Sequence, residues 1–128
     1  MSQDMDDEGK LCSMMLEANK NVRYAAVCNA DAKILWSCKR NDVDNILTLE
    51  ETKASLKRAI EAWQKRDELS DKIGKGLYAI VGYGKIKRIT VPLKNNHLLL
   101  LSVQPNKPEN LKDVMNIIKW VEEHPVQT

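Results

Sequence analysis

The chain contains two histidines, His97 and His124, the residues best suited to acid–base catalysis or zinc binding near neutral pH. A catalytic or metal-binding histidine needs partners, such as Ser, Cys or Asp, within the same site. Neither histidine has such a partner at the spacing of a known motif, and each lies in a predicted turn or chain end. We therefore predict surface histidines, no catalytic residues, no metal site and no enzymatic activity.

Three cysteines, Cys12, Cys28 and Cys38, could bind a metal or form one disulfide. They show no CxxC spacing and have no histidine at ligand spacing, so we expect thiols that fill the core. An odd number of thiols fits a reducing compartment, which predicts a cytoplasmic protein. In a hairpin that turns at residues 30–33, Cys28 would lie opposite about residue 35, out of register with Cys38.

Two glycine–lysine segments, residues 74–76 and 82–85, are similar to parts of phosphate-binding loops. Neither ends in the Lys-Ser or Lys-Thr pair of a P-loop, and the pattern predicts strands after both, where a nucleotide site needs a helix. Glycine beside a strand is more typical of a turn or bulge. We therefore expect no bound nucleotide and no other cofactor.

Basic residues gather at 39–40, 57–58 and 85–88 and could together form a patch for nucleic acid or anionic lipid. The chain carries 20 basic and 18 acidic residues, a net charge of only +2. This balance, and the alternation of polar with apolar residues around Arg88, favour a solvated face over a polyanion site. Binding of nucleic acid or lipid remains a remote alternative.

The length of 128 residues predicts one domain with one cooperative core. The longest apolar run covers residues 98–101 and is too short to span a membrane. The acidic start predicts a mobile tail at residues 1–9, because it has too little apolar area to offset the entropy cost of ordering. The domain is expected at 10–123, followed by a C-terminal tail at 124–128.

Periodicity predicts the order of the elements. After a short helix near residues 11–18, strand-forming residues predict a hairpin at 22–40. Thr48 and Glu51 form the capping box of a long helix at 48–67. Three strands follow at 77–83, 86–93 and 98–103, and a last helix at 108–123. The strand at 98–103 is apolar on both faces, which predicts a central position in the sheet.

The long helix has one apolar stripe, expected to cover the sheet, and a charged face that could contact a partner. The stripe consists of Leu49, Thr52, Leu56, Ala59, Ile60 and Trp63. Of the three tryptophans, Trp36, Trp63 and Trp120, we expect two in the core and any exposed one at an interface.

This order of elements resembles the roadblock/LC7 domain, which has a profilin-like α+β fold. Residues 82–93 and 97–102 are also similar to uncharacterised small archaeal proteins of the roadblock type. The resemblance covers residues 10–123. It implies a five-stranded antiparallel sheet in the order 2-1-5-4-3, with the long helix on one face and the terminal helices on the other.

The same resemblance implies a non-catalytic homodimer that regulates or scaffolds a partner such as a small GTPase or a motor complex. In the family dimer the long helix and the first strand of the meander meet their counterparts. The matching elements here are residues 48–67 and 77–83. On them we expect an interface that includes Lys53, Lys57, Arg58 and Glu61 of the helix and Leu77, Ala79, Val81 and Tyr83 of the strand. An alternative of a different class is a profilin-like small-molecule sensor, which would need a pocket between sheet and helix.

Overall fold

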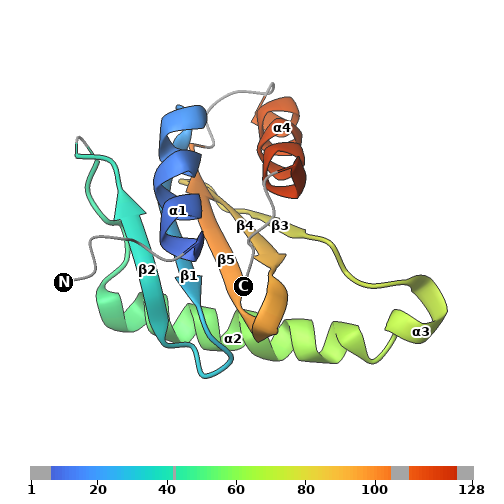
Figure 1. Cartoon of the computed structure of the whole chain (residues 1–128). Coiled ribbons are helices and arrows are strands. Elements are labelled where there is room, and N and C mark those ends of the chain that lie inside the picture. Colours follow the sequence, from blue (N-terminus) through green and yellow to red (C-terminus); the bar gives the residue numbers. More distant parts are fainter. Residues whose placement is uncertain (1–6, 42, 105–109, 124–128) are drawn as a thin grey trace.

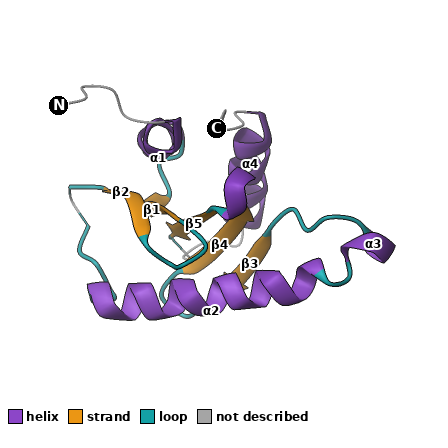
Figure 2. Cartoon of the chain, turned by 60° about the horizontal axis from the view of Figure 1, so that its bottom comes forward, coloured by secondary structure: helices purple, strands orange, loops and turns teal. Residues whose placement is uncertain are grey.

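A five-stranded antiparallel sheet separates two layers of helices (Figure 1). The computed structural model describes residues 7–41, 43–104 and 110–123. The strand order is β2-β1-β5-β4-β3, as predicted. Helix α2 covers one face, and α1 and α4 cover the other (Figure 2). The strands are β1 Val22–Cys28, β2 Ile34–Lys39, β3 Ala79–Gly82, β4 Lys87–Pro92 and β5 Leu98–Val103; the helices are α1 Asp7–Ala18, α2 Leu49–Asp67, α3 Ser70–Ile73 and α4 Asn110–Glu123, with a 3-10 turn η1 at Lys94–Asn96.

Several boundaries differ from the sequence prediction. Helix α1 begins at Asp7, so residues 7–9 of the predicted tail are helical, while residues 1–6 and 124–128 lie outside the described residues. Residues 70–73 form the short helix α3 where a loop was predicted, because one turn is too short to show apolar periodicity. It ends at Gly74, whose φ of 93° suits glycine.

Asn29 organises the β1–β2 turn. Its side-chain oxygen accepts hydrogen bonds from the backbone N–H groups of Asp31 (2.9 Å) and Lys33 (3.0 Å). Cys28 lies opposite Ile34, one residue from the predicted register, because a bulge follows Val27. All three cysteines are thiols. The interaction that sequence reasoning missed joins α1 to β2: a hydrogen bond with Cys12 lowers the pKa of Cys38.

The larger core lies between the sheet and the terminal helices. Its buried side chains are Cys12, Met15, Val22, Ala25, Val27, Ile89, Val91, Leu99, Leu101, Val103, Ile117, Ile118 and Val121. Arg40 fixes α1 to this layer, since its guanidinium donates to the backbone oxygens of Leu16 (2.6 Å), Asn19 (2.6 Å) and Val22 (2.7 Å). One predicted surface cation is therefore a structural cap of the α1 C-terminus.

A smaller core lies under α2, around Leu56 and Trp63. The indole N–H of Trp63 donates to the Thr90 hydroxyl at 2.9 Å, and a Cβ at Gly76 would collide with the same ring. Leu49, predicted to join the stripe, is 62% exposed because it begins the helix beyond this core. Trp36 and Trp120 are half-buried against the larger core.

Candidate functional site

Strand β3 lies at the edge of the sheet and pairs only with β4 among the described residues. Val81 is 48% exposed and Tyr83, just after the strand, is 55% exposed. Ala79 is half-buried, and Leu77 precedes the strand and is exposed. The chain therefore presents a short, apolar strand edge with backbone hydrogen-bonding groups directed away from the sheet.

A groove beside β3 separates this strand from one flank of α2. It has a volume of about 240 Å³. The α2 residues along it include Ser55, Arg58, Ala59, Ala62 and Arg66, and the β3 side contributes Ala79, Val81 and Tyr83. Since Ser and Ala side chains are short, α2 leaves this space open. We call it the β3 groove.

The structure divides the helix residues that sequence analysis assigned to an interface. Arg58 lines the β3 groove beside Val81 and Tyr83. Lys53, Lys57 and Glu61 are exposed and form a separate row with a spacing of four residues along α2. At about 100° per residue, this row lies on another flank of the helix.

A row of polar side chains crosses the sheet on the α2 face. Register pairs Tyr24 with both Lys39 and Ser102, and pairs Ser102 with Arg88, so these four residues lie side by side on four strands. We call them the polar row. The residues nearer Trp63 on the same face of β1 and β5 are apolar: Cys28, Leu98 and Leu100. The α2 face thus changes from apolar to polar at one level of the sheet.

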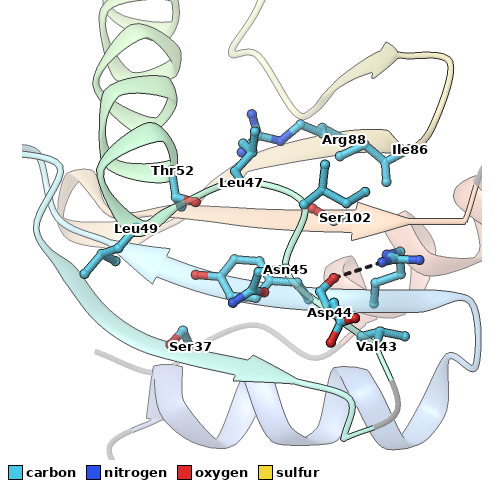
Figure 3. A pocket seen from close by; sticks show the side chains of 13 residues that line it. Ser37, Val43, Asp44, Asn45, Leu47, Leu49, Thr52, Ile86, Arg88 and Ser102 are labelled. Carbon is cyan, nitrogen blue, oxygen red and sulfur yellow. Dashed lines mark hydrogen bonds between the residues drawn. The ribbon is translucent and has the colours of Figure 1, made fainter.

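Residues 43–47, in the segment between β2 and α2, line a partly open cavity of about 180 Å³ (Figure 3). Arg23 holds this segment by donating to the backbone oxygen of Asp44 at 3.1 Å. Tyr24, Ser102 and Arg88 of the row line the cavity, together with Ser37 and Thr52. We call this space the Arg88 cavity.

Arg88 is half-buried, whereas the alternation of its strand predicted a solvated face. Its terminal nitrogen Nη2 donates to the Ser55 hydroxyl at 3.0 Å, but its Nε is shielded from solvent and has no acceptor. Burial lowers the pKa of Arg88. The prediction of a solvated face was wrong for this residue because alternation shows which residues share a face and not what covers them.

A larger, apolar groove adjoins the Arg88 cavity on the other side of residues 46–47. Its volume is about 540 Å³. Apolar side chains from Ile46, Leu47, Ala54 and Ile86 line it, and the cations Arg58, Lys85 and Arg88 contribute three positive charges against the single carboxylate of Glu51. Glu51 is already engaged, since it accepts a hydrogen bond from the Thr48 backbone in the predicted capping box.

Comparison with known proteins identifies the fold. No family model matches the sequence, and no curated protein matches it. Among solved structures, the gliding protein MglB from Thermus thermophilus superposes with a TM-score of 0.70 at 12% identity, over 92% of this chain and 84% of that chain. Myxococcus xanthus MglB gives a TM-score of 0.64 at 8% identity, over 94% and 96%. A roadblock/LC7 domain from Streptomyces avermitilis gives 0.60 at 9% identity, over 90% and 94%. The chain has the roadblock/LC7 fold.

The remaining sequence candidates are dispersed over this roadblock/LC7 fold. His97 is half-buried directly after η1, and His124 lies outside the described residues. Within residues 7–41, 43–104 and 110–123, no group of three His, Cys, Asp or Glu residues could hold a metal ion. No helix in the same part of the chain is long and apolar enough to cross a membrane.

The basic residues do not form the single patch that sequence analysis considered. Arg40 is used in the cap of α1, and Arg88 lies under α2. Lys85 and Arg58 lie at the apolar groove. The alternation of side chains along the strands could have indicated the polar row. Tyr24, Ser102 and Arg88 each lie on the same face of the sheet as apolar residues that are two positions away or on adjoining strands.

Proposed function

We propose that the chain is a non-catalytic scaffold or regulator that acts as a homodimer, built through β3 and the adjoining flank of α2. The observation that carries this proposal is the apolar edge of β3 beside an open groove. Edge strands of this kind tend to be covered or paired. Antiparallel pairing of two copies of β3 would make one continuous sheet and satisfy the outward-facing backbone groups.

The α2 flank supports the same arrangement. The short side chains of Ser55, Ala59 and Ala62 leave the β3 groove open enough for a second helix to approach closely. The proposed interface therefore centres on Arg58, Ala79, Val81 and Tyr83, with Leu77 at its margin. Lys53, Lys57 and Glu61, on the other flank, are left for a different partner.

A small GTPase is the partner that the family resemblance implies. The exposed charges on the outer flank of α2 would steer such an encounter, because exposed charges act mainly on association rates. One similar solved structure is that of MglB in a tetrameric arrangement, and the arrangement is a property of that protein. It superposes on this chain with a TM-score of 0.63 at 10% identity.

Sedimentation of a β3 variant tests the dimer. We expect Val81→Lys to lower the mass to that of one chain, 14.6 kDa, because lysine at a strand edge opposes pairing. Met14→Lys is the matched control: Met14 is 43% exposed, close to the 48% of Val81, but lies on α1 across the sheet. A wild-type mass of 14.6 kDa at high concentration would refute the proposal.

A further inference from the structure

We propose that the Arg88 cavity binds a small organic anion whose carboxylate or phosphate group lies over the polar row and whose apolar part extends into the adjoining apolar groove. The first argument is charge. A guanidinium remains ionised in proteins, and placing it under α2 costs free energy unless an anion accompanies it. The groups beside Arg88 that favour its charged form are the tyrosines Tyr83 and Tyr24. The carboxylate that lines the Arg88 cavity, that of Asp44, is exposed, and the guanidinium of Arg23 lines the same cavity.

Unused hydrogen-bonding capacity is the second argument. Among the described residues, the hydrogen-bond partners of the Arg88 side chain are the hydroxyls of Ser55 and Tyr83, and its Nε lacks an acceptor. An oxyanion supplies several acceptor sites and matches the planar fork of a guanidinium. A small adjustment of Arg88 on binding would bring its unpaired N–H into use.

The neighbouring hydroxyls form the third argument. Tyr24 and Ser102 stand beside Arg88 in the register of the sheet, and Thr52 of α2 lines the same cavity. Burial raises the pKa of Tyr24, so its hydroxyl stays protonated at neutral pH and can donate to an anion. Three strands and one helix thus direct donors into one space.

The adjoining groove defines the rest of the ligand. Its volume of about 540 Å³ falls within the usual range of small-molecule sites, roughly 300–1,000 Å³. Ile46, Leu47 and Ile86 line both spaces, so an apolar chain could pass from the Arg88 cavity into the groove along them. Arg58 and Lys85 at the groove add positive charge, which favours an anion over a neutral or cationic molecule.

Titration with simple amphiphilic anions tests the site. The probes are sodium octanoate and octyl phosphate, which carry the two headgroups, with acetate and inorganic phosphate as headgroups without a chain. We expect saturable heat of binding for at least one octyl probe, with weaker binding of its headgroup alone. Sodium chloride at equal ionic strength controls for screening of charges. The better octyl probe identifies the headgroup.

Variants separate this site from nonspecific attraction. Arg88→Gln should weaken binding of the better octyl probe by about tenfold or more, the usual loss for a charged hydrogen bond. Lys94→Gln removes one charge from η1, outside both spaces, and should bind as the wild type does. Ser102→Ala should weaken binding while leaving the thermal melt close to wild type, which covers the case in which Arg88→Gln fails to fold.

Two results would overturn the inference. One is the absence of saturable binding by all four probes to the wild-type chain. The other is binding of the octyl probe that is unchanged in Arg88→Gln. If that variant does not fold, unchanged binding in Ser102→Ala has the same meaning. Neither result bears on the homodimer, because the mass of the wild-type protein is measured separately.

Discussion

Individual side chains on the α2 face show how far residue patterns can be read from sequence. Alternation in β4 correctly places Arg88 and Thr90 on the face opposite Ile89 and Val91, which the structure confirms through the Trp63–Thr90 and Arg88–Ser55 hydrogen bonds. It could not indicate that residues 43–47 line a cavity together with Arg88, because that segment has no periodicity and its path depends on tertiary contacts. The Arg88 cavity was therefore not predicted.

Tyr24 should make stability depend on alkaline pH. Burial raises its pKa above the ordinary value of 10.0, so on raising the pH the unfolded chain loses the tyrosine proton first. The stabilising contribution is complete below about pH 10 and is lost as the pH rises towards the folded-state pKa. We expect urea denaturation to show a steeper loss of stability above about pH 10 for the wild type than for Tyr24→Phe. Parallel curves for the two proteins would show that Tyr24 is not the group responsible.

Elements were predicted where a local rule applies along their whole length. The capping box at Thr48 and Glu51 and the apolar stripe defined α2, and the doubly apolar run defined β5 as a central strand. The contact between Gly76 and Trp63 could not be predicted, since it joins a loop to a helix through space. Likewise, a helical pattern shows that Arg58 and Lys57 are both exposed, but only the sheet decides which flank of α2 borders β3.

The two flanks of α2 should respond differently to charge reversal. Arg58→Glu, at the β3 groove, should weaken self-association because it changes a side chain within the proposed interface. Lys57→Glu, the adjacent residue on the other flank, should leave the dimer intact. Both positions are exposed, so the free energy of unfolding of each variant should lie within about 0.5 kcal/mol of the wild-type value after correction for dimerisation. Equal dissociation constants by sedimentation equilibrium would show that the β3 flank is not the interface.

At the scale of the whole molecule, the order of elements carried more information than residue identity. The predicted topology matches solved roadblock/LC7-type structures at identities of 8–12%, a level at which few positions are shared. A sequence can adopt this topology if it has the right order of strand and helix periodicities and suitable connections between them, and many sequences meet these requirements. Specific partners and ligands depend on the few residues at the edge strand and cavity, and element order does not determine those.

The two edges of the sheet also differ in a way that predicts the size of the assembly. Exposed lysines lie at the β2 edge, Lys39 on the strand and Lys33 just before it, whereas β3 has exposed Val81. Lysine at an edge opposes strand addition, so β3 should pair with another β3 and not with β2. Such a contact uses the same surface on both copies and closes after two chains, whereas pairing of β3 with β2 would continue into a filament.

The wild-type mass should therefore rise with concentration and stop at twice 14.6 kDa. Because only the folded chain dimerises, the melting temperature should also rise with protein concentration, and that dependence should disappear in Val81→Lys. Light scattering over a wide concentration range, with thermal melts on the same samples, measures both. A wild-type mass well above that of two chains, lost in Val81→Lys, would mean that β3 pairs with a different surface. The open edge of β2 would then be the first surface to examine.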